Sequence, residues 1–261
     1  MSLTKKNIGL CLSGGGARGF AHLGVLQAFD ELKIPINMLS GSSAGALAAV
    51  FYAYGYSPQK AKEIVLQRKF WQYVSLRPSR WGLMRLEKTG RIIKGYLPED
   101  DFKALKIPVA ICATNISRGI PEYFTEGELI KPLLASSCVP FFFRPVEING
   151  SKYVDGGLSD NLPLSPLKEC NFRISVNITP FEKRLPVKSV KDVILKSVYI
   201  SLDHQTHFKA KEADLSIVPE GIIRFDGFRM KQADRIFETG YRTAMKVLKP
   251  LLQTSELSAK I

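Results

Sequence analysis

Histidine and cysteine, the side chains that most often bind transition metals, are scarce among the 261 residues of this sequence. There are three histidines and four cysteines, and no two cysteines form a Cys-x-x-Cys pair or lie close together. This spacing disfavours a metal site or a disulfide framework built from them. Cys11, Cys112 and Cys138 lie in apolar or small-residue runs, which predicts buried, reduced thiols in a cytoplasmic protein.

Long apolar runs are also lacking. The longest candidate, Ala44–Tyr56, falls short of the roughly 20 apolar residues that a membrane-spanning helix needs. The first residues, MSLTKKNIGLCLSGGG, contain two lysines but no apolar stretch that ends in a small-residue cleavage site. We therefore interpret them as a first strand, and we expect neither a signal peptide nor a membrane-spanning segment.

Acidic residues are outnumbered, with 24 against 37 basic residues and a net charge of +13. The segment Lys60–Lys94 holds ten basic and two acidic side chains and includes Trp71 and Trp81. We expect Val74–Gly82 to be a loop, and the whole segment to make peripheral contact with an anionic membrane, at its inner surface. The alternative is that its aromatic side chains pack against the core. No nucleic-acid-binding module accompanies the charge, so we expect no nucleic-acid partner, and nothing indicates the oligomeric state.

Strand and helix signals alternate along the chain, which is typical of an α/β sheet covered on both faces. The predicted strands are Asn7–Leu12, Ile36–Leu39, Ile107–Ala113 and Phe172–Ile178, with a hairpin over Val146–Val154 that turns at Asn149-Gly150. The predicted helices are Phe20–Leu32, Ala44–Tyr54, one that begins at Ser57-Pro58, Lys191–Lys211 and Met230–Lys249.

The segment Leu39–Ala46, LSGSSAGA, lies between a predicted strand and a predicted helix. It matches Gly-x-Ser-x-Gly with Ser43 in the middle, the pattern of a nucleophile elbow. In such a turn the serine hydroxyl is exposed, and glycines flank it because neighbouring backbone leaves no room for a Cβ. The alternative is a plain small-residue turn. The strand–turn–helix context favours the elbow, and it makes Ser43 rather than Ser42 the candidate nucleophile.

A second glycine-rich segment, Gly14-Gly15-Gly16-Ala17-Arg18-Gly19, also follows a strand and precedes a helix. It fits Gly-x-Gly-x-x-Gly, but a dinucleotide site needs an acidic residue near the end of the next strand, and Ile36–Gly41 has none. The sequence also lacks Gly-x-x-x-x-Gly-Lys-Ser/Thr, so no cofactor is expected. Backbone amides at a helix N-terminus instead suit an oxyanion hole, to which Arg18 would add a positive charge.

The usual base for a serine nucleophile is histidine. His22 lies one turn into the first predicted helix, where we expect it to pack against its neighbours. His204 and His207 share a helix face but have no acidic or cysteine partner at ligand spacing, so we interpret them as structural or solvent-facing. The other candidate is Asp155, which ends a predicted strand and precedes two glycines. Taken alone, an aspartate in that position is more often part of a plain turn.

The order GGGARG, GSSAG and DGG within one α/β domain resembles the patatin-like phospholipase family, although many members have DGA in place of DGG. Residues Gly19–Leu26 (GFAHLGVL) and Ala135–Pro145 (ASSCVPFFFRP) look like that family's first helix and the segment before its aspartate hairpin. The resemblance covers about residues 8–180, and we expect a helical part at about 190–250 within a single domain over 1–261. It implies a three-layer α/β/α sandwich with a mainly parallel central sheet.

The resemblance also implies a Ser–Asp dyad that needs no histidine. Carried over by motif, Ser43 is the nucleophile, Asp155 is its partner, and Gly14, Gly15, Gly16 and Arg18 form the oxyanion site. The implied activity is release of fatty acids from phospholipid or lysophospholipid esters. Two alternatives stay open: a carboxylesterase or thioesterase for soluble acyl substrates, and a non-catalytic regulatory protein that keeps the fold. The basic, aromatic segment favours a lipid substrate, and the intact dyad counts against a purely regulatory role.

Overall fold

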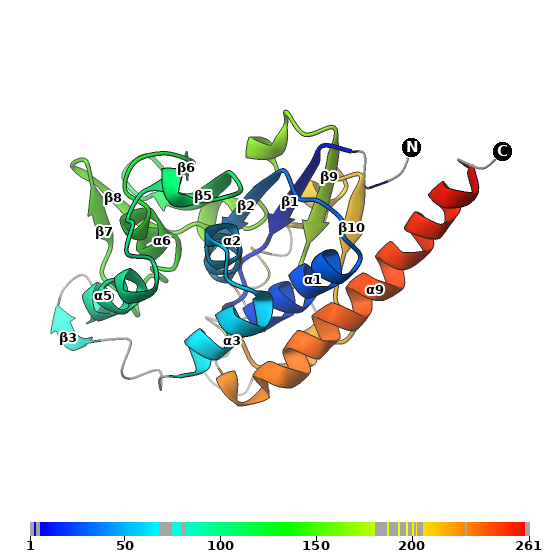
Figure 1. Cartoon of the computed structure of the whole chain (residues 1–261). Helices are drawn as coiled ribbons and strands as arrows, with labels where there is room; N and C mark the ends of the chain where they lie inside the picture. Colours follow the sequence, from blue (N-terminus) through cyan, green and yellow to red (C-terminus); the bar gives the residue numbers. More distant parts are fainter. Residues whose placement is uncertain are drawn as a thin grey trace.

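The centre of the fold is a mainly parallel sheet (Figure 1). The computed structural model describes residues 6–67, 75–79, 82–180, 206–227 and 229–258, with single positions at 3, 187, 193, 197, 200 and 202. The strand order is β10-β9-β1-β2-β5-β8-β7, and β6 pairs with β5. The strands are β1 (Ile8–Leu12), β2 (Met38–Ser42), β5 (Val109–Asn115), β6 (Ile120–Phe124), β7 (Val146–Ile148), β8 (Ser151–Asp155), β9 (Phe172–Val176) and β10 (Leu215–Ile217). Strands β10, β9, β1, β2 and β5 run parallel, whereas β6, β7 and β8 pair antiparallel.

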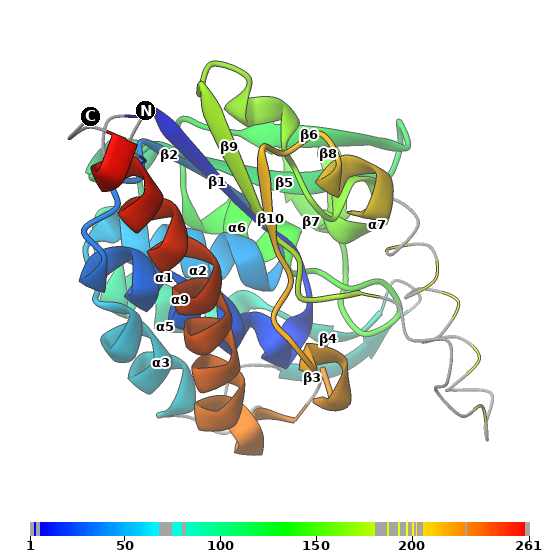
Figure 2. The same cartoon turned by 90° about the vertical axis from the view of Figure 1, so that its right-hand side faces the viewer.

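Helices cover the sheet, and β1 shows how its residues divide between two cores. The described helices are α1 (Phe20–Glu31), α2 (Ala44–Tyr54), α3 (Pro58–Leu66), α5 (Glu87–Tyr96), α6 (Ile130–Ser136), α7 (Gly157–Asp160) and α9 (Ala233–Ser258). Leu10 and Leu12 belong to the larger core with α1, α2 and α9, whereas Cys11 packs with Leu164 and Leu167 on the other face. Figure 2 shows α1 and α9 together on one side of the sheet. The predicted α/β class with a mainly parallel sheet is therefore confirmed.

Helices α1 and α9 cross in close contact. A Cβ on Gly24 would collide with the carbonyl of Phe237, and a Cβ on Gly240 would collide with the carbonyl of Ala21. Glycine at both positions lets the two backbones approach, which fixes the last helix to the sheet. Helix α9 begins three residues later than predicted and continues past Pro250. None of the described helices has the length and apolar content required to cross a membrane.

Several local signals are confirmed. The side chain of Ser57 caps α3 by accepting a hydrogen bond from the Lys60 amide at 3.2 Å. Asn149 and Gly150 have φ angles of 49° and 76°, as a tight hairpin turn between β7 and β8 requires. Most of the predicted helix Lys191–Lys211 lies outside the described residues. Within its described part, residues 206–210 are helical.

The prediction of a loop over Val74–Gly82 is wrong. Strands β3 (Ser75–Ser79) and β4 (Gly82–Arg85) form a separate antiparallel pair there. Proline does not prevent this, because a two-stranded ribbon has free edges at which the missing amide proton is not needed. The pair is attached to the segment before β7, since the Met84 amide donates to the Phe142 carbonyl at 2.9 Å.

Candidate active site

Ser43 occupies the turn between β2 and α2. Its φ and ψ angles are 52° and −119°, a conformation that non-glycine residues rarely adopt and that is typical of a strained elbow. A Cβ on Gly41 would lie 2.6 Å from the Ala46 amide nitrogen, and a Cβ on Gly45 would collide with the Leu12 carbonyl. Close backbone contacts therefore explain both glycines of the Gly-x-Ser-x-Gly sequence.

The register of β5 brings Ser43 and Asp155 together. Along β5, Cys112 pairs with Ser42 of β2, and the next residue, Ala113, pairs with Asp155 of β8. Strand β6 pairs with β5 over residues 111–115, so β2 and β8 share the opposite edge and meet end to end there. The serine after β2 and the aspartate at the end of β8 are thus neighbours, although 112 positions separate them in the sequence.

Burial sets the electrostatics of Asp155. Loss of solvent raises the pKa of its carboxyl from the ordinary 3.8 to about 6. Two hydrogen-bonding partners oppose the rise: the Gly157 amide, which donates to Oδ1 at 2.8 Å, and the Ser43 hydroxyl. A carboxylate with a pKa of about 6, beside a serine hydroxyl, is better matched to accept a proton at physiological pH than an exposed aspartate.

The glycine-rich loop after β1 lies against the elbow. A Cβ on Gly14 would lie 3.4 Å from the Ser43 Cβ, so Gly14 directly adjoins this serine. The Gly14 amide donates to the Asn161 carbonyl at 3.2 Å. Within the described residues, the amides of Gly15 and Gly16 have no such acceptor. Two backbone donors of the glycine-rich loop therefore have no acceptor in the described part of the chain and can bind an anion.

The Arg18 side chain makes hydrogen bonds that the sequence did not predict. Its side chain is buried, and its guanidinium donates from Nε to the Phe225 carbonyl at 2.8 Å and from Nη2 to the Ile223 carbonyl at 3.3 Å. These bonds tie the glycine-rich loop to residues that follow β10.

The described histidines do not contact the Ser43–Asp155 pair. His22 is buried and donates from Nε2 to the Ser13 carbonyl at 2.7 Å. Burial lowers the pKa of His22 to about 4, so its ring is neutral at physiological pH. His207 is exposed on helix residues 206–210, and His204 lies outside the described residues. The packing role predicted for His22 agrees with these contacts.

Two supporting residues were missed by sequence reasoning. The hydroxyl of Ser136, at the end of α6, accepts a hydrogen bond from the Ser43 amide at 2.8 Å. Asn161 accepts from Gly14 through its carbonyl, and its side-chain nitrogen donates to the Thr179 hydroxyl at 2.9 Å. Both residues lie close to motifs in the sequence, but spacing alone does not reveal which backbone groups they hold.

Comparison with known proteins gives the family. A sequence model described as patatin-like phospholipase matches residues 10–168. An uncharacterised NTE family protein of Mycobacterium tuberculosis is 30% identical over 174 residues, which cover 66% of this chain and 48% of the relative. Lysophospholipase NTE1 of Candida glabrata is 31% identical over 196 residues, covering 71% of this chain and 11% of that protein. The chain thus spans about half the length of the mycobacterial relative and much less of the yeast one.

Solved structures agree in fold. The crystal structure of VipD from Legionella pneumophila superposes with a TM-score of 0.62 at 15% sequence identity, covering 94% of this chain and 67% of VipD. At that identity the likeness concerns the fold alone. The matching family model spans the glycine-rich loop, the elbow and the aspartate hairpin described above. This chain belongs to the patatin-like phospholipase family.

Proposed function

We propose that this chain is a serine acyl hydrolase that releases fatty acids from phospholipid or lysophospholipid esters, with Ser43 as nucleophile and Asp155 as its base. The observation that carries the proposal is the strained serine at the elbow beside a buried carboxyl with a raised pKa. Strain of this kind persists where the surrounding structure enforces it, and it is concentrated at functional sites. The lysophospholipase name of the yeast relative supports a lipid ester as substrate.

The proposed reaction has two steps. Ser43 Oγ attacks the ester carbonyl carbon and transfers its proton to the Asp155 carboxylate, while the carbonyl oxygen becomes an oxyanion. The amides of Gly15 and Gly16 stabilise that oxyanion, Gly14 leaves room for it, and Arg18 holds the loop in place. The alcohol leaves with the proton from Asp155. Asp155 next accepts a proton from water as the water oxygen attacks the acyl carbon, and it returns that proton to Ser43 Oγ, which leaves as the fatty acid is released.

We further propose that Lys60–Lys94 brings the chain to the inner surface of an anionic membrane. Nearly half of this segment's side chains, including both tryptophans, lie outside the described residues. The proposal is supported by the segment's charge and aromatic content. The four cysteines are buried and free, as expected for a chain that works in a reducing compartment.

The decisive test combines covalent labelling with product analysis. A fluorophosphonate probe should modify Ser43, and intact-protein mass spectrometry should find no label on Ser43→Ala. The unmodified chain should release fatty acid from lysophosphatidylcholine, and Ser43→Ala should not. The variants His204→Ala and His207→Ala should keep hydrolysis, because no histidine takes part. Label that persists on Ser43→Ala, or release only from soluble thioesters, would contradict the proposal.

A further inference from the structure

Phe141 is an outlier in two respects. Its backbone has a φ of 73°, in the left-handed region that bulky residues avoid, and its side chain is 73% exposed. Each feature costs free energy, since the turn would form more easily with glycine and the ring would be better buried. Its one described ring contact is edge-to-face with Phe142, at a centroid distance of 5.6 Å. In the part of the chain that the structure describes, nothing offsets this cost, which indicates a partner outside the molecule.

The turn that carries Phe141 adjoins the candidate active site. The Phe143 amide donates to the Val139 carbonyl at 3.0 Å, which closes the turn with Phe141 at its centre. Immediately before this turn, the carbonyl of Cys138 accepts from the Asp155 amide at 2.9 Å. The exposed ring is therefore three residues from a backbone group that positions the proposed base.

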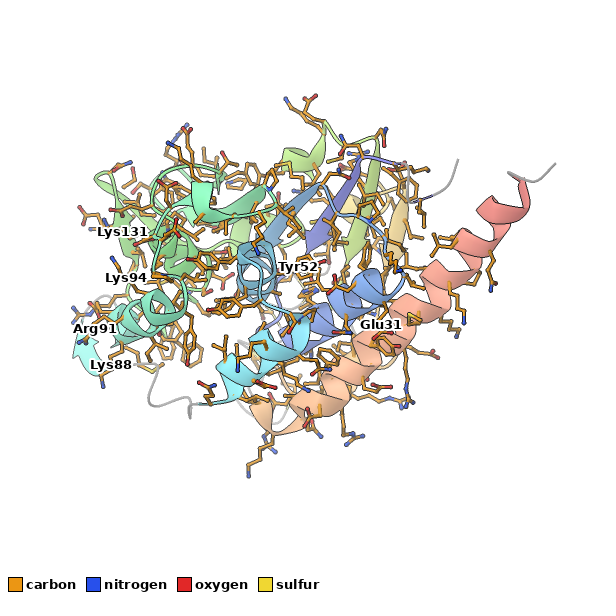
Figure 3. All side chains as sticks on the ribbon, viewed as in Figure 1. Glu31, Tyr52, Lys88, Arg91, Lys94 and Lys131 are labelled. Atoms are coloured by element: carbon orange, nitrogen blue, oxygen red, sulfur yellow. The ribbon has the colours of Figure 1, made fainter. Side chains whose placement is uncertain are left out.

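The residue after this turn is hydrogen-bonded to β4, which precedes a basic stripe on α5. The Arg144 amide donates to the Met84 carbonyl at 3.1 Å, and α5 begins three residues after Met84. On α5, Lys88, Arg91 and Lys94 recur every third residue and are exposed. Figure 3 shows these side chains along the edge of the molecule opposite α9.

The α5 stripe has no internal charge partner in the described part of the chain. Ile93 of α5 is buried, and a Cβ on Gly90 would lie 3.0 Å from a methyl group of Leu134, so this side of the helix faces α6. Among the described residues, no carboxylate forms an ion pair with Lys88, Arg91 or Lys94. Nearby Lys131 differs, because Glu128 pairs with it at 2.8 Å.

We propose that Phe141 and the α5 stripe together form a docking surface for an anionic phospholipid bilayer. The ring inserts among the acyl chains, and the three cations contact the headgroups. An exposed aromatic side chain, together with cations that have no ion-pair partner among the described residues, complements a surface that is anionic outside and apolar beneath. This inference rests on the proposed function, which supplies the lipid, and it adds a residue outside Lys60–Lys94. Docking in this way brings the turn next to Asp155 against the membrane.

The test measures binding without turnover. In the Ser43→Ala background, the chain is sedimented with phosphatidylcholine vesicles that contain or lack phosphatidylserine. Replacing Lys88, Arg91 and Lys94 with glutamine should weaken binding to the anionic vesicles on the order of 100-fold, because each basic group near such a surface contributes a factor of about five. Phe141→Gly should weaken it roughly tenfold, through loss of a buried ring. Phe141→Gly should also melt at the same or a higher temperature, because glycine suits the turn.

A matched control removes the same charge elsewhere. Lys231, Lys246 and Lys249, exposed near or on α9, are replaced by glutamine and should leave binding within about twofold. Unchanged vesicle binding in either docking variant overturns the proposal, as does an equal loss in the control. Loss of oligonucleotide binding with unchanged vesicle binding would assign the stripe to nucleic acid and overturn it as well. Vesicle binding is measured in Ser43→Ala, which does not hydrolyse lipid in the proposed mechanism. A failure of the docking proposal is therefore distinguished from a failure of the proposed hydrolysis, which is measured as fatty-acid release.

Discussion

Ser43 combines a strained backbone with an ordinary side chain. At a φ of 52° and a ψ of −119°, only glycine is relaxed. We expect Ser43→Ala and Ser43→Gly to be equally inactive but unequally stable. The free energy of unfolding of Ser43→Gly should be up to about 1 kcal/mol higher than that of Ser43→Ala, because alanine keeps the backbone strain and glycine relieves it. Urea unfolding of both variants measures the difference, and equal stability would show that the elbow is not strained.

Asp155 gives the proposed reaction a pH dependence. Its carboxyl must be ionised to accept the Ser43 proton, and burial raises its pKa to about 6. We therefore expect kcat/KM on a lysophospholipid to fall about tenfold per pH unit below pH 6 and to level off above it. A profile that stays flat down to pH 4 would exclude Asp155 as the base.

The same carboxyl makes the native state less stable at neutral pH. Between pH 4 and pH 6 the folded chain holds a proton that the unfolded chain releases, so stability falls as pH rises through this range. Asp155→Asn removes this loss. Relative to the unmodified chain, the variant should gain up to about 3 kcal/mol of unfolding free energy between pH 4 and pH 7, while losing hydrolysis by orders of magnitude. Thermal melts at both pH values test this, and a gain independent of pH would contradict it.

The sequence predicts the glycine pattern of the elbow better than the contacts that surround it. Gly41 and Gly45 are visible as a pattern because close backbone contacts exclude every other residue. Arg18 looks like a free charge in the sequence, yet it is buried against the carbonyls of Ile223 and Phe225. Its partners lie over 200 positions away, and no local spacing rule reports contacts of that range.

At the scale of elements, local signals again determined what could be predicted. Helix α2 has the predicted bounds, Ala44–Tyr54, and Asn149-Gly150 fixes the hairpin of β7 and β8. The β3–β4 pair was missed because Pro78 and Gly82 are typical of loops. Its stability depends in part on a distant segment, through the bond between Met84 and Phe142. Pairing over such a distance leaves no periodicity in the strand itself.

A buried ion pair connects α7, which follows Asp155, to the helix at residues 206–210. The Asp160 side chain has no solvent exposure, and Lys209 pairs with its Oδ2 at 2.6 Å. The Tyr123 hydroxyl donates to the same oxygen at 2.6 Å. Removing one partner of such a pair leaves a buried charge without compensation.

We expect Lys209→Met to lower the free energy of unfolding by about 3–5 kcal/mol. Lys131→Met is the matched control, because its pair with Glu128 has a similar distance of 2.8 Å but is exposed, and it should cost at most about 1 kcal/mol. Adding Asp160→Asn to Lys209→Met should recover part of the loss, since no unpaired carboxylate then remains. Chemical denaturation of the three variants checks this, and equal effects of the two lysine variants would contradict it.

At the scale of the whole molecule, the positive charge is concentrated. Ten basic and two acidic residues give Lys60–Lys94 a net charge of +8, which leaves +5 for the rest of the chain. At the start of this segment, Lys60 and Lys62 already pair with Glu63 and Asp234 at 3.1 and 2.7 Å. The charge available to a partner therefore lies further along the segment, where β3, β4 and α5 follow.

This concentration predicts that position, and not net charge, governs membrane binding. Replacing Arg77, Arg80 and Arg85 with alanine should strongly weaken sedimentation with phosphatidylserine-containing vesicles. The same charge change at Lys231, Lys246 and Lys249 should have little effect, because attraction is screened beyond about 8–10 Å in physiological salt. Binding of the unmodified chain should also weaken as salt rises and require the anionic lipid. If both triple variants lost binding equally, the net charge of +13 would be the cause, and the segment would have no special part in it.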